Sequence, residues 1–179
     1  RGTHNYENIC AAIAATKELV DVEASVETIQ KFKGVEHRLE FIREIDGVKW
    51  YNDSIGTSPT RTIAGLKSFD ERIVLIAGGY DKHLDYTPIA KPILERVDSL
   101  ILIGDTAPKI FDCVKAEAEK QGKDIKIYMC DEFKNIVLVA RKVAKPGQIV
   151  LFSPASASFD LFRNFEERGN KFKELVNEL

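Results

Sequence analysis

The residues best suited to chemistry lie in short polar loops that follow apolar runs of the chain. Lys82 comes shortly after Gly78-Gly79, where its ammonium could meet a carboxylate or a phosphate as a point charge. Spacing alone equally allows a solvated loop lysine. Asp53 could accept hydrogen bonds from a ribose or orient a basic group, although the composition of 52–54 is also common in turns. These residues could bind an anion or a sugar, but their spacing does not define a reaction.

Further candidates come from the last part of the chain and from a basic residue before the sheet. We expect Ser158 to cap a last helix over about 158–178. The free N–H groups of a helix N-terminus bind carboxylates, although a serine there is usually only a cap. Phe159 and Phe165 belong to a triplet at three-residue spacing, which favours core packing. Arg38 could stack on a ring or bind a phosphate, and a surface position is equally compatible.

These candidates depend on an alternation of apolar runs and helical segments that would position them. The runs lie at 72–77, 99–104, 125–130 and 149–152, and helices are predicted at about 59–69, 87–96, 106–121 and 132–144. The alternation predicts an α/β fold, with a Rossmann-like, mostly parallel sheet flanked by helices. Asp46-Gly47 joins two strand-like runs and predicts a hairpin.

The polar loops follow the expected carboxyl ends of the strands. These loops lie at 52–58, 78–85, 104–108 and 153–158. Ligands of open parallel sheets bind at this edge, so we expect the four loops to form the site.

The first 35 residues do not follow this alternation. Helices are predicted at 4–20 and at 25–33, the second capped by Ser25. We therefore divide the chain into 1–35, the end of a preceding helical unit, and 36–179. The chain begins at Arg1 without an initiator methionine, so we expect either a processed protein or a piece of a larger one.

Composition excludes several classes of protein. Hydrophobic residues make up 44% and charged residues 30% of 179 residues, which is ordinary for a globular protein and excludes a disordered chain, a collagen and a membrane protein. The net charge of −2 provides no overall electrostatic attraction for nucleic acid. Three scattered cysteines form neither a disulfide framework nor a metal-ligand cluster, so we expect no metal site and a cytoplasmic protein. The P-loop pattern does not occur, and Gly78-Gly79 is a weak signal for NAD.

Six motifs carry a resemblance that spacing alone does not provide. They are His4-Asn5-x-x-Asn8, His37-Arg38-Leu39-Glu40, Asn52-Asp53-Ser54, Gly78-Gly79-x-Asp81-Lys82, Ser153-Pro154-Ala155-x-Ala157-Ser158 and Asn164-Phe165-Glu166-x-Arg168-Gly169. In this order they strongly resemble the Mur ligases, and most closely the members that add D-glutamate. The resemblance covers essentially the whole chain.

The resemblance implies part of an ATP-dependent amide ligase of peptidoglycan synthesis. Such an enzyme joins D-glutamate to UDP-N-acetylmuramoyl-L-alanine through an acyl phosphate and a tetrahedral intermediate, with Mg²⁺ offsetting phosphate charge. Residues 1–35 would end the ATP-binding central domain, and 36–179 would form the C-terminal amino-acid-binding domain. The P-loop and the metal ligands would lie upstream. The resemblance thus places no catalytic residue within this chain and implies that the chain alone is inactive. We expect a monomer in full-length form.

The resemblance also assigns binding residues. It places Asn8 and Arg38 at the nucleotide and Asp53 at its ribose. The positions implied for D-glutamate are Thr57, Lys82, Ser158, Phe159 and Phe165.

One position departs from the family pattern, and other functions stay open. The chain has Ile55-Gly56-Thr57 where the family often has Lys-Ala-Thr, and we hypothesise that Arg61 replaces the missing lysine. The near alternatives are a Mur ligase for another amino acid and folylpolyglutamate synthetase. The others are a stand-alone nucleotide- or NAD-binding Rossmann module and a non-catalytic interaction domain.

Overall fold

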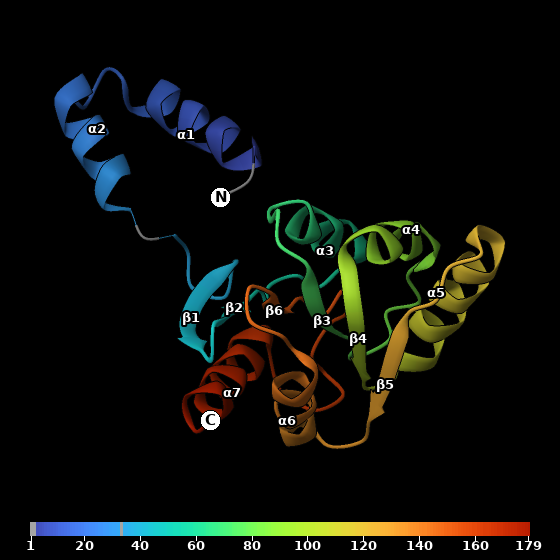
Figure 1. The fold of residues 1–179 in the computed structure, drawn as a ribbon. Coiled ribbons are helices and arrows are strands. Elements are labelled where there is room, and N and C mark those ends of the chain that lie inside the picture. Colours follow the sequence, from blue (N-terminus) through green and yellow to red (C-terminus); the bar gives the residue numbers. More distant parts are fainter. Residues whose placement is uncertain (1–2, 33) are drawn as a thin grey trace.

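The computed structural model describes residues 3–32 and 34–179, which form a six-stranded sheet covered by helices and preceded by two further helices (Figure 1). The strands are β1 (Glu40–Ile45), β2 (Val48–Asn52), β3 (Ile73–Ala77), β4 (Val97–Ile103), β5 (Lys126–Cys130) and β6 (Ile149–Phe152). The helices are α1 (Thr3–Thr16), α2 (Val22–Lys31), α3 (Pro59–Leu66), α4 (Thr87–Arg96), α5 (Ala107–Gln121), α6 (Phe133–Val143) and α7 (Phe165–Asn177). The predicted α/β class is confirmed.

The sheet has the order β1-β2-β6-β3-β4-β5, and every pairing except β1–β2 is parallel. All residues of β3 and β6 are buried, which explains why their sequences are apolar without alternation. Asp46 and Gly47 have φ angles of 52° and 76°, as a tight β1–β2 turn requires. The predicted hairpin is therefore correct.

Two apolar cores lie on the two faces of the sheet. Leu75 of β3 packs in the core beneath α3, α4 and α5, whereas the next residue, Ile76, packs in the core beneath α6 and α7. Successive side chains of a strand point to opposite faces. Phe152 and Phe172 stack at 4.5 Å in the second core. Packing in the two cores holds the strands in place, and the strands in turn position the loops at their carboxyl ends.

The last helix begins later than predicted. Residues 158–164 form a turn and an irregular segment, and α7 starts at Phe165. Asn164 is the N-cap, because its side chain accepts from the N–H of Glu167 at 2.8 Å. The prediction that Ser158 caps this helix is wrong, because a better cap lies six residues on.

The two N-terminal helices lie apart from the sheet (Figure 1). No side chain described within residues 6–32 is buried. Asp21, rather than the predicted Ser25, caps α2, since its carboxylate accepts from the N–H of Ala24 at 2.7 Å. The division at residue 35 stays a prediction. Among the described residues, no helix is long and apolar enough to span a bilayer.

Candidate functional site

Four loops meet at the carboxyl edge of the parallel strands. The N–H of Gly78 donates to the carbonyl of Pro154 at 2.8 Å, which joins the loops after β3 and β6. The N–H of Tyr80 donates to the carbonyl of Ala157 at 3.0 Å, and that of Thr106 to the carbonyl of Gly79 at 3.0 Å. β2 pairs with β6, so the loop after β2 lies at the same edge. The predicted gathering of these loops is confirmed.

Gly78 and Gly79 permit this close approach. Their φ angles are 109° and 148°, which side chains rarely allow. A Cβ on Gly78 would lie 2.0 Å from the carbonyl oxygen of Ile103, and one on Gly79 would lie 2.3 Å from that of Ala157. The two glycines therefore let the loop after β3 pack closely against the end of β4 and against the loop after β6.

Lys82 and Phe159 lie together on this edge, although they come from different loops. The Lys82 Nζ is 5.3 Å from the centre of the Phe159 ring, and Tyr80 contacts the same ring edge-on at 5.8 Å. The Phe159 side chain is 56% exposed. Within the described residues, no carboxylate forms an ion pair with Lys82. An exposed cation beside an exposed ring is thus available for an anionic ligand.

Ser158 and Thr57 lie on the loops that flank this pair. Ser158 is buried, and its carbonyl accepts from the N–H of Phe162 at 2.8 Å in a single turn. Ser158 therefore does not stand at the N-terminus of a long helix, whose free N–H groups could bind a carboxylate. Thr57 is half-buried, and no hydrogen bond, ion pair or ring contact within the described residues joins it to Lys82 or Phe159.

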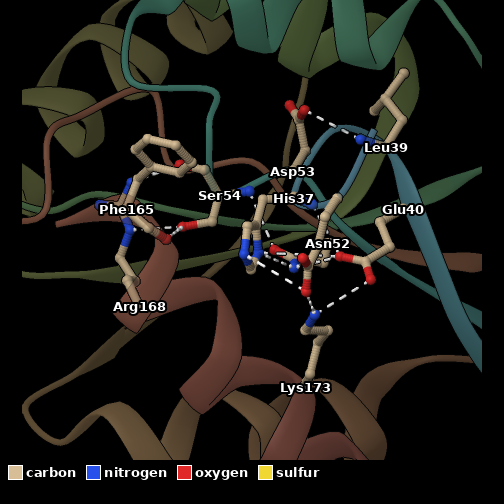
Figure 2. A network of polar contacts seen from close by, with 10 residues as sticks. His37, Leu39, Glu40, Asn52, Asp53, Ser54, Phe165, Arg168 and Lys173 are labelled. Carbon is tan, nitrogen blue, oxygen red and sulfur yellow. Dashed lines mark hydrogen bonds and ion pairs between the residues drawn. The ribbon is translucent and has the colours of Figure 1, made fainter. Parts of the chain in front are cut away.

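Phe165 contacts a different set of residues from those around Lys82 and Phe159. It is the first residue of α7, and its ring meets the His37 ring edge-on at 6.0 Å. Its carbonyl accepts from the Ser54 hydroxyl at 2.7 Å. The structure therefore places Phe165 against His37 and Ser54 (Figure 2).

Asp53 is buried and already bonded. Its Oδ2 accepts from the Ser153 hydroxyl at 2.6 Å, and its Oδ1 accepts from the N–H of Leu39 at 3.3 Å. Burial raises the pKa of the Asp53 carboxyl to about 6, against the opposing effects of these hydrogen bonds and of the charges on Arg38 and Arg61. The carboxyl group thus joins the loops after β2 and β6, and its contact with a ribose stays a prediction.

The remaining predicted residues lie at different distances from this centre. Arg38 is half-buried and Arg61 exposed, and both stand close enough to Asp53 for their charges to lower its pKa. Asn8 is exposed on α1, apart from the sheet (Figure 1). The structure therefore groups Arg38, Arg61 and Asp53, but not Asn8.

Sequence reasoning missed the most heavily bonded side chain of the site, Arg168. It is 2% exposed, and its guanidinium donates to the hydroxyl and carbonyl of Ser54 and to the carbonyls of Ser156 and Ala157. Burial lowers its pKa to about 10, so it is charged at neutral pH. The motif that contains Arg168 carried the resemblance, but a charged helical residue normally indicates a solvated face.

A second polar network lies beside it (Figure 2). The His37 Nδ1 is 2.9 Å from the Asn52 Nδ2, which also donates to the Glu40 carboxylate at 3.0 Å. Glu36, His37 and Glu40 could together hold a metal ion. The ammonium of Lys173 already bonds both of these carboxylates, so a cation of the protein itself occupies the cluster.

Comparisons with known proteins define the class. A family model described as the Mur ligase, glutamate ligase domain, matches residues 37–156. This chain belongs to the Mur ligase family. It is 53% identical to the UDP-N-acetylmuramoylalanine–D-glutamate ligase of Acetivibrio thermocellus, over 99% of this chain and 39% of that protein. It is 50% identical to the enzyme of the same name from Clostridium novyi, over 100% of this chain and 39% of that protein.

Solved structures share the fold at low identity. A pseudomurein peptide ligase type C from Methanothermus fervidus has a TM-score of 0.67 and 19% identity, covering 99% of this chain and 36% of its own. E. coli FolC, solved with ADP, has a TM-score of 0.67 and 15% identity, covering 96% and 39%. These two likenesses support the fold alone. The chain spans about two fifths of the length of the curated relatives it matches.

Proposed function

We propose that this chain forms the amino-acid-binding part of an ATP-dependent ligase that adds D-glutamate to UDP-N-acetylmuramoyl-L-alanine in peptidoglycan synthesis. The carrying observation is the ammonium of Lys82, which lies beside Phe159 where the loops after β3 and β6 meet and forms no ion pair with a carboxylate of the described residues. Support for the substrate comes from relatives at 53% and 50% identity whose names state a D-glutamate ligase.

The chemistry of the loops suits a small dianion. D-Glutamate carries two carboxylates, so it needs a cation and several hydrogen-bond donors. Lys82 supplies the charge, and the hydroxyls of Thr57 and Ser158 are donors on the flanking loops. Phe159 and Phe165 would wall the pocket with apolar surface.

The nucleotide would lie toward the loop after β2. We assign Arg38 to its phosphates or ring and Asp53 to the ribose, and Asn8 would join them from α1. The Asp53 carboxylate accepts one hydrogen bond on each oxygen, from Leu39 and from Ser153, and its remaining lone pairs could accept from a ribose hydroxyl.

Mg²⁺ would accompany ATP, but we assign no ligand for it to this chain. Asp53 is engaged by Leu39 and Ser153, and Lys173 neutralises the cluster of Glu36 and Glu40. The chain's own contribution is to hold D-glutamate so that its amine can attack an acyl-phosphate carbonyl, form the tetrahedral intermediate and displace phosphate. We further propose that the complete enzyme is a cytoplasmic monomer.

A chimera tests this function. Residues 1–179 would replace the matching segment of the Acetivibrio thermocellus ligase, which is 53% identical to this chain. Phosphate release from ATP would be measured with UDP-N-acetylmuramoyl-L-alanine and a panel of D-glutamate, L-glutamate, meso-diaminopimelate and L-lysine. We expect turnover with D-glutamate only. Preference for another amino acid would instead indicate a ligase of different specificity.

A further inference from the structure

The buried guanidinium of Arg168 has a place in the site that the residues assigned to D-glutamate do not share. Its Nε donates to the Ser54 hydroxyl at 3.1 Å and its Nη2 to the Ser54 carbonyl at 2.9 Å. Nη2 also donates to the carbonyl of Ser156 at 3.1 Å, and Nη1 to that of Ala157 at 2.7 Å. One side chain of α7 thus holds the loops after β2 and β6. Figure 2 shows Arg168 beside Ser54 of the first of these loops.

The loop after β3 joins the same assembly. The carbonyl of Ala157 accepts from Arg168 and also from the N–H of Tyr80. A Cβ on Gly79 would lie 3.0 Å from the Arg168 Nη1, so this backbone lies directly against the guanidinium. Arg168 therefore contacts the segments that lead into Thr57, Lys82 and Ser158.

The charge of Arg168 is not neutralised by its partners. All four acceptors are carbonyl or hydroxyl oxygens. Among the residues that the structure describes, no carboxylate forms an ion pair with it, and Asp160 acts on it only through its charge at longer range. A buried cation without an anion is costly compared with an apolar side chain of similar volume. The guanidinium carbon also lies 5.8 Å from the centre of the Phe152 ring, a contact that offsets part of this cost but leaves the net charge in place.

We infer that Arg168 is a positioning residue of the amino-acid site. Its planar fork holds the three loops in one arrangement, and its uncompensated charge stabilises a dianionic ligand bound in front of them. Arg168 does not touch the ligand, because its N–H groups are directed at protein oxygens. The inference rests on the proposed D-glutamate function and adds a residue to that site.

The test compares kinetics of the chimera with Arg168→Met and Arg168→Lys. Loss of both charge and fork in Arg168→Met should raise the KM for D-glutamate at least ~10-fold, since a nearby charge in a partly buried site is worth a kcal/mol or more. The KM for ATP should change less than about 2-fold. Arg168→Lys should recover part of the loss. Arg163→Met is the matched control, because the Arg163 side chain is 92% exposed, and it should leave both KM values unchanged.

Ser54→Ala keeps the test decisive if the Arg168 variants do not fold. It removes one acceptor of the guanidinium, the hydroxyl at 3.1 Å, together with the hydrogen bond that this hydroxyl donates to the carbonyl of Phe165 at 2.7 Å. It should raise the KM for D-glutamate about 3-fold or more, as the loss of one or two hydrogen bonds predicts. The inference is overturned if Arg168→Met, or Ser54→Ala in its place, changes the KM for D-glutamate no more than the KM for ATP.

Lys82→Ala separates this inference from the proposed function. A KM for D-glutamate that Lys82→Ala leaves unchanged contradicts the proposed site itself. A KM that rises in Lys82→Ala but not in the Arg168 variants contradicts only the role of Arg168.

Discussion

Replacing Asp53 by asparagine should remove a pH-dependent loss of stability from this chain. The Asp53 side chain is buried between the N–H of Leu39 and the hydroxyl of Ser153. Burial raises the pKa of its carboxyl from the ordinary 3.8 to about 6, because the charged form loses its hydration. Asparagine has nearly the same shape and carries no charge at any pH.

The direction and size of the effect follow from linkage. Below pH 3.8 the carboxyl is protonated in both the folded and the unfolded chain. Between pH 3.8 and about 6 the unfolded chain ionises first, so folding becomes less favourable as pH rises. A difference of about two pH units at about 1.4 kcal/mol each corresponds to about 3 kcal/mol. Above pH 6 both states are ionised and the cost stays constant.

Urea unfolding of both proteins between pH 3.5 and 7.5 measures this effect. The free energy of unfolding of Asp53→Asn minus that of the unsubstituted chain should rise by about 3 kcal/mol across the window. Asp70→Asn, which removes an exposed carboxylate, controls for the change in net charge. A difference that stays flat, or falls with rising pH, would refute the reasoning about Asp53.

Three further outcomes follow from the same geometry. Arg61→Ala in the chimera should raise the KM for D-glutamate about 10-fold if Arg61 replaces the family lysine, whereas Lys67→Ala, directly after the same helix, should not. An unchanged KM in Arg61→Ala rejects the substitution hypothesis. Gly169→Ala should lower the free energy of unfolding by about 1–3 kcal/mol in urea titrations, because the added Cβ would lie 2.3 Å from the His37 Nδ1. Equal stability of the two proteins would show that the His37 ring can move aside. The 179-residue chain alone should release no phosphate from ATP with both substrates present, since its sequence has no P-loop pattern, and measurable turnover would disprove this.

The central sheet could be predicted because local pattern and tertiary position agree. Residues 73–77 are apolar throughout and form a strand buried on both faces. The Asp46-Gly47 turn adopts the positive φ angles that its composition favours. Such elements can be predicted without knowing which distant residues they contact. The same reasoning placed the polar loops at one edge, because the carboxyl ends of parallel strands meet there.

The start of the last helix was predicted wrongly because two signals competed. Ser158 suggested a cap at the start of this helix, but Asn164 and Glu167 form reciprocal caps further along. The Asn164 side chain accepts from the Glu167 N–H, and the Glu167 carboxylate accepts from the N–H of Arg163 at 2.8 Å. The Asn-x-x-Glu spacing was readable in the sequence. This spacing, given more weight than the serine, predicts the start of the helix correctly.

The role of Arg168 was not readable from local pattern. A charged residue in a helix normally faces solvent, and Arg168 is buried only because loops more than ten residues away in sequence converge on it. His37 is similar, since its φ is 61° and its Nδ1 lies 2.9 Å from the Nδ2 of Asn52 in β2, neither of which a local pattern indicates. Tertiary contacts therefore decide the parts of the site that the sequence left open.

We propose that these loops hold the two carboxylates of D-glutamate, and a crystal structure of the chimera with D-glutamate and ADP would show this contact. We expect the ligand at the carboxyl edge of the sheet, with one carboxylate within hydrogen-bond distance of Lys82 and the other bonded by the loops that carry Thr57 and Ser158. D-Glutamate bound on a different surface, or at this edge without contact to Lys82, would contradict it.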